Sequence, residues 1–314
     1  MSSMFLPPPM QQINSAIAHR ANVDLYVLRL DLIHPWVNGN KWFKLKYNLL
    51  EAKQKNFTTL LTFGGAYSNH IYATAAAGNL FNFRTIGVIR GEERLPLNPT
   101  LRFAVQQGMQ LVYLNRETYR QRHTTALQEY LRQCFGEVFI IPEGGCNLNG
   151  VRGCTEIINT AEFDTICVAC GTATTLAGIA LSLHEGQRAI AFPVLKNGAF
   201  LAQEIDSLLT NYLASGLPAP TKPGPWELVC DYHFGGYAKV NDELLRFSQQ
   251  FRDTHGILLD YVYTSKMFYG VMDLLQQGFF SQSDRQRHRL LLVHTGGLQG
   301  NAGIEARLQT FSST

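Results

Sequence analysis

The chain has 314 residues, of which 46% are hydrophobic and 16% charged, and its formal net charge is +3. This composition excludes an intrinsically disordered chain, and the length is typical of about two domains with large hydrophobic cores. The basic residues are scattered apart from two short arginine-rich stretches, so no continuous stripe is available to bind a phosphate backbone. We therefore expect a globular protein without a nucleic-acid partner.

In the first half of the chain, short β-branched runs alternate with longer helical segments. The expected strands cover residues 26–30, 59–63, 84–90, 110–114 and 138–141. The expected helices cover residues 41–53, 69–80, 98–107 and 117–134. The same alternation continues in the second half, with helices at 150–161, 174–184, 199–213, 241–254 and 265–277, and a short closing helix.

The expected strands of the second half are residues 165–169, 189–194, 227–230, 257–259 and 289–294. Such alternation is typical of an α/β protein with twisted, mostly parallel sheets covered by helices. Residues 165–183 carry no charge and are almost long enough to span a bilayer. A strand, a Gly-Thr turn and a helix account for them better, so we expect no membrane partner.

The cysteines and the N-terminal sequence bear on the cellular compartment. The six cysteines show no disulfide spacing, and the chain start lacks the basic end and apolar run of a signal peptide. Cys167 and Cys170 form a CxxC pair, but a strand would place them on opposite faces of a sheet. We expect a cytoplasmic protein without a metal site.

Lys41 follows Gly39 and Asn40 at the start of an expected helix. A backbone turn there can bring its amine into a cleft, where the amine becomes nucleophilic only if desolvation lowers its pKa. The alternative is that Lys41, Lys44 and Lys46 form the solvated face of that helix.

Ligands of open parallel sheets bind at the carboxyl ends of the strands, so the loops that follow strands are of interest. Ser68 and Asn69 lie in one such loop, at positions where any helix start prefers these residues. The loop from Gly171 to Thr175 opens another helix with small and hydroxyl-bearing residues. It could bind a phosphate at the helix N-terminus, or it could be an ordinary tight turn.

Six loop motifs occur together in one order along the chain. They are Gly39-Asn40-Lys41, Gly65-Ala66-Tyr67-Ser68-Asn69-His70, Pro142-Glu143-Gly144-Gly145, Gly171-Thr172-Ala173-Thr174-Thr175, Val262-Tyr263-Thr264 and His294-Thr295-Gly296-Gly297. In this order the set resembles the 1-aminocyclopropane-1-carboxylate deaminase and D-cysteine desulfhydrase family over roughly residues 25–300. The resemblance implies pyridoxal-phosphate enzymes of the tryptophan-synthase-β fold type (fold type II), which are usually homodimers. It implies a large cofactor-binding domain of residues 1–45 and 146–314 and a small domain of residues 46–145, with the cofactor between them.

The resemblance also implies roles for individual residues. Lys41 would be the Schiff-base lysine and the general base at the substrate α-carbon. Ser68 would lie beside the substrate carboxylate or act as a nucleophile, and Asn69 would hydrogen-bond the phenolate oxygen of the ring. The phosphate cradle would consist of Gly171, Thr172, Ala173, Thr174 and Thr175. The two active-site phenols would be Tyr237 and Tyr263, and the residues on the pyridine side of the ring would be Thr264 and Thr295.

Two positions depart from the family pattern. Ala173 replaces a glycine that is usual in the phosphate loop, which the backbone tolerates if φ is negative there. Thr264 stands where ring-opening deaminases have a glutamate that keeps the pyridine nitrogen protonated. Because a neutral hydroxyl supports electron withdrawal less well, this position favours loss of a good leaving group such as thiolate.

The expected activity is that of a pyridoxal-phosphate lyase on a small amino acid, in the manner of D-cysteine desulfhydrase, giving a 2-oxo acid and ammonia. The expected classes also include deaminases and hydrolases. The alternatives are a 1-aminocyclopropane-1-carboxylate deaminase, a synthase or racemase with the same cofactor, and a non-enzymatic protein that binds a nucleotide phosphate.

Overall fold

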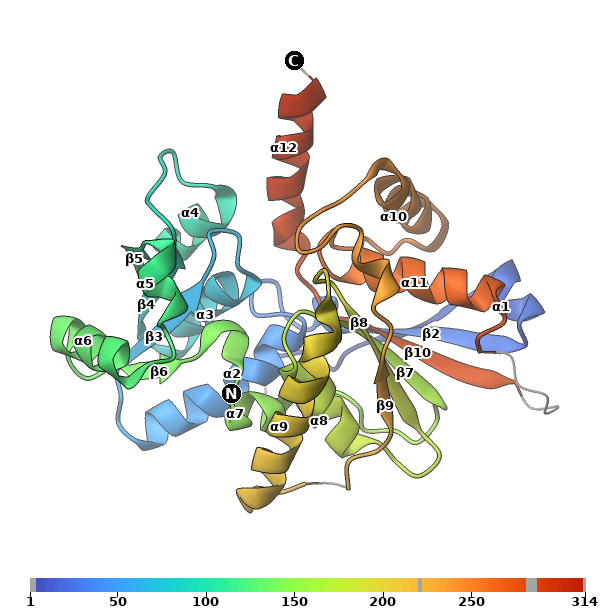
Figure 1. The fold of residues 1–314 in the computed structure, drawn as a ribbon, viewed down its shortest axis with the longest axis horizontal. Coiled ribbons are helices and arrows are strands. Elements are labelled where there is room, and N and C mark those ends of the chain that lie inside the picture. The colour runs from blue at the N-terminus through green and yellow to red at the C-terminus, as the bar shows by residue number, and fades with distance from the viewer. Residues whose placement is uncertain (1–3, 220–221, 281–286, 313–314) are drawn as a thin grey trace.

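The fold contains two separate sheets, as Figure 1 shows for the computed structural model, which describes residues 4–219, 222–280 and 287–312. The six-stranded sheet has the order β1-β2-β10-β7-β8-β9, and the four-stranded sheet has the order β5-β4-β3-β6. Every strand pair is parallel except β1 with β2. The expected α/β architecture with mostly parallel sheets is confirmed.

The large sheet lies between two helical layers. Its strands are β1 (Met10–Ile13), β2 (Val23–Arg29), β7 (Thr165–Cys170), β8 (Arg188–Pro193), β9 (Trp226–Leu228) and β10 (His288–His294). One layer contains α7 (Leu148–Cys154), α8 (Thr174–Ser182) and α9 (Leu201–Ala214), and the other contains α1 (Ala16–Arg20), α10 (Asp242–His255) and α11 (Thr264–Gln276). Because both faces are covered, every residue of β7 is buried. Cys167 and Cys170 are free and belong to the cores on opposite faces, as predicted.

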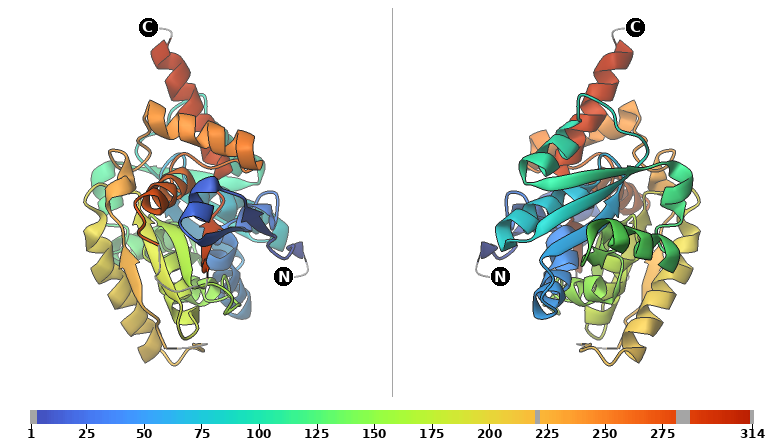
Figure 2. Two further views of the ribbon diagram at one scale, coloured as in Figure 1. Left: turned by 90° about the vertical axis from the view of Figure 1, so that its right-hand side faces the viewer. Right: turned by 90° about the vertical axis from the view of Figure 1, so that its left-hand side faces the viewer.

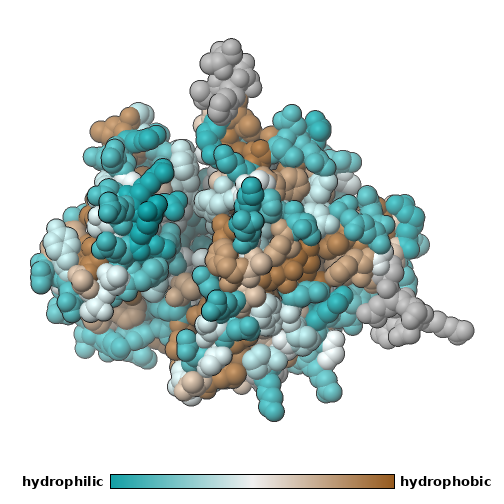
Figure 3. Space-filling view, viewed as in Figure 1, coloured by the Kyte–Doolittle hydropathy of each residue, from teal (hydrophilic) through white to brown (hydrophobic). Residues whose placement is uncertain are grey.

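The small sheet and its helices form the left-hand part of Figure 1. Its strands are β3 (Thr59–Gly64), β4 (Arg84–Arg90), β5 (Met109–Leu114) and β6 (Phe139–Ile141). The neighbouring helices are α2 (Asn40–Gln54), α3 (Asn69–Phe81), α4 (Pro99–Gln106), α5 (Arg116–Arg120) and α6 (Thr125–Phe135). In Figure 3 this part is mainly hydrophilic, whereas hydrophobic side chains gather over the large-sheet part of the same face.

The last helix, α12 (Asn301–Ser312), projects from the rest of the fold in Figures 1 and 2. The expected domain division would place the two sheets in different domains and cut helix α2 after residue 45. That division stays a prediction.

Several expected elements differ from the structure. The long helix expected at 117–134 is divided into α5 and α6, because Thr124 caps a new helix by accepting a hydrogen bond from the Leu127 N–H. The helix expected at 150–161 ends at Cys154. Residues 257–259 form no strand, and β1 and α1 were not expected.

Residues 165–183 form β7, a turn and the helix α8, as expected. Across residues 4–219, 222–280 and 287–312, no helix has the length and hydropathy to cross a bilayer.

Candidate active site

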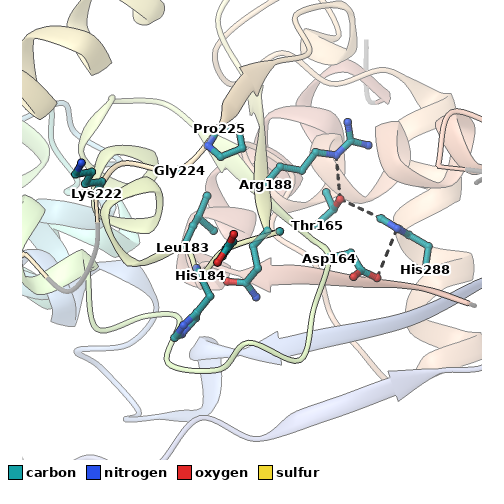
Figure 4. A pocket seen from close by; sticks show the side chains of 12 residues that line it. Asp164, Thr165, Leu183, His184, Arg188, Lys222, Gly224, Pro225 and His288 are labelled. Carbon is teal, nitrogen blue, oxygen red and sulfur yellow. Dashed lines mark hydrogen bonds and ion pairs between the residues drawn. The ribbon is translucent and has the colours of Figure 1, made fainter.

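Two pockets lie at opposite ends of the large sheet. The carboxyl-end pocket, of about 650 Å³, is lined by loops that follow β3, β6, β7 and β10 and by the start of α2. The amino-end pocket, of about 800 Å³, lies where β7, β8 and β10 begin (Figure 4). The predicted site residues gather at the carboxyl-end pocket, where parallel sheets bind ligands.

Nine of the twelve predicted site residues line the carboxyl-end pocket. They are Lys41, Ser68, Asn69, Gly171, Thr172, Thr175, Tyr237, Tyr263 and Thr295. The other three, Ala173, Thr174 and Thr264, are fully buried and do not line it. Segments far apart in the sequence therefore meet at one site, and three predicted residues lie behind its surface.

Lys41 lies in the first turn of α2, and the preceding backbone holds it there. Gly39 has a φ of +63°, and a Cβ at this position would lie 1.9 Å from the carbonyl oxygen of Thr295. Only glycine allows this close approach. Burial, followed by the positive charge of Lys44, lowers the pKa of Lys41 to about 7. The condition for a nucleophilic lysine is thus met.

Lys44 does not belong to a solvated helix face. Its residue is only 2% exposed, and its Nζ donates a hydrogen bond of 2.9 Å to the hydroxyl of Thr172. Three positions after Lys41, it lies on the same side of α2 and lines the same pocket. Lys46 fits the surface interpretation, since it pairs with Glu156 near solvent. The sequence analysis missed Lys44, although its spacing from Lys41 was the available signal.

The loop from Gly171 to Thr175 is held in place by its neighbours. Ala173 has a φ of −59°, so its backbone does not require glycine. A Cβ at Gly171 would lie 2.6 Å from the ring of Tyr263, so a larger residue there would displace that ring. The hydroxyl of Thr175 accepts a hydrogen bond of 3.0 Å from the Asn40 side chain. The loop, α2 and Tyr263 thus form one packed unit.

Ser68 and Asn69 combine helix capping with a position in the pocket. The Ser68 hydroxyl oxygen accepts from the N–H groups of His70 and Ile71, at 3.2 and 3.3 Å, as an N-cap does. The Oδ1 of Asn69 accepts a hydrogen bond of 2.7 Å from Gln299, a residue that the sequence analysis missed. This contact leaves the amide nitrogen of Asn69 as a donor.

His70 is 1% exposed, and its tautomer follows from its neighbours. The Thr62 hydroxyl donates to the carbonyl of Ile141 at 2.8 Å, so it can only accept from His70 Nε2, at 2.9 Å. Nδ1 is then an unprotonated acceptor, and it has no hydrogen-bond partner among the described residues. Burial lowers the pKa of His70 well below its ordinary value, which keeps the ring neutral.

Tyr237 and Tyr263 form a pair of phenols, with ring centroids 6.1 Å apart and planes at 72°. Burial raises the pKa of both residues, and for Tyr263 the neighbouring Tyr237 raises it further. The ammonium group of Lys266, also missed in the sequence, donates to the carbonyls of His233 and Gly236, at 2.8 and 2.7 Å. Lys266 therefore positions the loop that carries Tyr237.

Thr264 begins α11 behind the pocket. Its hydroxyl donates to a carboxylate oxygen of Asp260 at 2.7 Å and accepts from the Asp260 N–H at 2.8 Å. The same carboxylate accepts from the N–H groups of Val262 and Tyr263. Asp260 thus fixes the whole turn that precedes α11.

The amino-end pocket is lined by side chains that bind one another. The hydroxyl of Thr165 accepts from Arg188 Nε at 3.1 Å and lies 3.0 Å from His288 Nε2, as Figure 4 shows. His288 Nδ1 faces Asp164 at 3.6 Å. None of the predicted site residues lies in this pocket.

Three comparisons bear on this geometry. The family model described as "Pyridoxal-phosphate dependent enzyme" matches residues 6–296. A protein of Pyrococcus horikoshii with the provisional name 1-aminocyclopropane-1-carboxylate deaminase is 32% identical, over 90% of this chain and 87% of its own length.

A protein of Arabidopsis thaliana, named bifunctional D-cysteine desulfhydrase/1-aminocyclopropane-1-carboxylate deaminase, is 29% identical over 88% of this chain and 73% of its own length. A crystal structure described as an ACC deaminase homologue superimposes with a TM-score of 0.82 and 27% identity, covering 98% of this chain and 94% of that one. The expected fold type is confirmed.

Proposed function

Because the chain belongs to the family of pyridoxal-phosphate dependent enzymes, we propose that it is a lyase that acts on D-cysteine or a similar small amino acid. The reaction removes the β-substituent and gives sulfide, ammonia and a 2-oxo acid. The observation that carries the proposal is the half-buried Lys41, whose desolvated amine has a pKa of about 7, in a pocket that also holds Lys44 and the Gly171 to Thr175 loop. Family membership sets aside the alternative of a non-enzymatic nucleotide-phosphate protein.

The residues present fit pyridoxal phosphate. A buried ammonium, that of Lys44, and the hydroxyl of Thr172 meet at the N-terminal end of α8, where the helix N–H groups also favour an anion. Lys44, Gly171, Thr172 and Thr175 would hold the phosphate, and Lys41 Nζ would hold the aldehyde carbon. We propose that the buried Ala173 and Thr174 contribute backbone N–H groups rather than side chains.

When bound, the cofactor supplies the electron sink for the pair left on the substrate α-carbon. Lys41 Nζ removes and holds the α-proton, for which a pKa of about 7 is well suited. The Ser68 hydroxyl oxygen already accepts hydrogen bonds from two backbone N–H groups, so its own O–H points away from them and can donate to another group. This arrangement favours donation to the substrate carboxylate over a nucleophilic role.

Asn69 would donate its amide N–H to the ring phenolate oxygen, since Gln299 binds the amide oxygen and orients the group. Tyr263, kept protonated by burial, donates a hydrogen bond to the departing thiolate, and the ring of Tyr237 lies beside it. Thr295 lines the pocket, and we assign it to the pyridine side from the family resemblance. Thr264 stays assigned to that side from its place in the sequence, and its contact with Asp260 fixes its hydroxyl.

A 1-aminocyclopropane-1-carboxylate deaminase is the second candidate, because the Pyrococcus horikoshii and Arabidopsis thaliana relatives carry that name. We place it second because Thr264, whose neutral hydroxyl bonds to Asp260, stands where the resemblance gives ring-opening deaminases a glutamate. The test compares kcat/KM for sulfide release from D-cysteine with kcat/KM for ammonia release from 1-aminocyclopropane-1-carboxylate. We expect the former to be larger, and the opposite order would reverse the assignment.

The expectation of a hydrolase is wrong. The chain belongs to a family whose reactions depend on pyridoxal phosphate, and the relatives are named deaminases and desulfhydrases. In such enzymes bond breaking begins with electron withdrawal from the α-carbon and not with attack of water on the substrate.

We also propose a cytoplasmic homodimer. Six free cysteines support a reducing compartment. Light scattering of the purified holoenzyme would test the dimer, and a mass of one chain would contradict it. Fractionation of cells would test the compartment.

A further inference from the structure

The carboxyl-end pocket holds more positive charge than cysteine cleavage uses. Its lining contains five lysines and arginines and two glutamates. Lys41 and Lys44 serve the cofactor in the proposed function, and Arg122 pairs with Glu143 at 2.7 Å. Two guanidinium groups, those of Arg90 and Arg307, are left without a carboxylate partner among the described residues.

Arg90 is the last residue of β4 and is exposed at the carboxyl end of the small sheet. One of its Nη atoms lies 3.7 Å from the point where a Cβ of Gly65 would be, so the guanidinium lies beside the loop that leads to Ser68. Within residues 4–219, 222–280 and 287–312, its guanidinium makes no hydrogen bond and no ion pair. Burial raises the pKa of Tyr237, and the charge of Arg90 opposes part of that rise.

Arg307 reaches the same pocket from α12. Its Nε donates to the Gly303 carbonyl and its Nη2 to the Ala238 carbonyl, both at 3.3 Å. Ala238 follows Tyr237, so these contacts hold the guanidinium near the phenol pair. Several of its N–H groups remain available to an anion.

We infer that the substrate carries a second negative charge on its β-substituent, an oxyanion such as a sulfate or phosphate ester, and that Arg90 and Arg307 bind it. The inference rests on the proposed function, since it names the substrate class of the same site. Guanidinium groups bind oxyanions through paired, charge-assisted hydrogen bonds, which an uncharged thiol cannot accept as well. They also stabilise the charge of the departing group.

For serine O-sulfate the reaction breaks the Cα–H and Cβ–O bonds, and sulfate leaves with the electron pair of the Cβ–O bond. One water then converts the resulting 2-aminoacrylate, through its imine form, to pyruvate and ammonium. In total, serine O-sulfate and water give pyruvate, ammonium, sulfate and one proton. No oxidant or reductant is required.

The test measures kcat/KM of the holoenzyme for D- and L-serine O-sulfate and for D-cysteine, in the wild type and in Arg90→Gln and Arg307→Gln. The matched control is Arg84→Gln, which changes an exposed arginine at the other end of β4. We expect the wild type to prefer a serine O-sulfate over D-cysteine. In Arg90→Gln the ratio of kcat/KM for serine O-sulfate to kcat/KM for D-cysteine should fall about 10- to 100-fold, as expected for the loss of a charged hydrogen bond. Arg84→Gln should leave the ratio unchanged.

A second measurement uses inorganic sulfate as an inhibitor of D-cysteine turnover. We expect competitive inhibition that is weaker in Arg90→Gln and Arg307→Gln. Cofactor absorbance and thermal unfolding verify that each variant is folded. If Arg90→Gln does not fold, Arg307→Gln provides the test.

Equal losses for both substrates would overturn the inference, because Arg90 would then serve the α-carboxylate or the loop. Turnover of D-cysteine without turnover of serine O-sulfate would also overturn it and leave the proposed function standing. A protein that turns over neither these substrates nor 1-aminocyclopropane-1-carboxylate would overturn the proposed function itself.

Discussion

The two pockets at the ends of the large sheet differ in the balance of their polar groups. At the amino-end pocket, Arg188, Thr165, His288 and Asp164 bind one another. At the carboxyl end, Lys41 is desolvated and His70 Nδ1 has no described partner. The desolvated amine of Lys41 distinguishes the carboxyl end, where parallel sheets bind ligands, because His288 Nδ1 at the amino end also makes no hydrogen bond among the described residues.

The strongest test of this contrast replaces one lysine in each pocket. Lys41→Ala should abolish the cofactor absorbance and lower turnover of D-cysteine about 100- to 10,000-fold, because the α-proton loses its base. Lys222→Ala, in the amino-end pocket, should change neither. Retained turnover in Lys41→Ala would contradict the assignment of the site.

The next effect concerns the phosphate. Lys44→Met should weaken binding of pyridoxal phosphate about 10- to 150-fold, since it removes a buried charged donor. Binding of pyridoxal, which lacks the phosphate, should change much less. Lys46→Met on the same helix is the control, and fluorescence titration of the apoprotein measures both ligands. Equal weakening for both would show that Lys44 supports the fold and not the phosphate.

The pKa of Lys41 predicts a pH dependence. Only the free amine reacts with an aldehyde, so reconstitution of the apoprotein should accelerate about tenfold from pH 6 to pH 8, with a midpoint near 7. Because the pKa of Lys41 is about 7 in the folded protein and 10.5 ordinarily, the unfolded chain binds more protons than the folded chain between about pH 7 and pH 10.5. Lys41 therefore makes the free energy of unfolding rise with pH over that window. A midpoint near 10 would show that the amine is solvated.

The smallest effect on turnover is expected at the amino end. His288→Phe removes the contact to Thr165 and should lower the free energy of unfolding by about 1–2 kcal/mol, measured with urea. Turnover of D-cysteine by the folded variant should stay within twofold of wild type. A large loss of turnover in a stable variant would show that the amino-end pocket takes part in the chemistry.

The sequence predicted what is local and periodic. Strand β4 and the start of α3 follow from β-branched residues and from the Ser68 cap, and the family resemblance named nine residues that line one pocket. The strand expected at 257–259 failed for a tertiary reason. The side chains of His294 and Asn301 contact the carbonyls of Leu258 and Leu259, respectively, so these groups have partners without a neighbouring strand.

The burial of individual side chains could not be predicted from the sequence either. A run of lysines at a helix start has the same sequence pattern whether the side chains face solvent or a pocket, so Lys44 was missed. Lys266 and Gln299 were missed because their partners are far away in the chain or are backbone carbonyls. Thr264 was expected on the pyridine side, which stays a prediction, and its contact with Asp260 could be found only in three dimensions.

Helix α2 has a consequence for cofactor choice. It carries both the amine proposed to hold the aldehyde and the ammonium proposed to hold the phosphate, three residues apart on one rigid element. The Cα atoms of the two lysines are therefore offset by about 4.5 Å along the helix axis. Because one helix carries both groups, it would distinguish cofactor analogues by the distance between aldehyde and anion as well as by their charge.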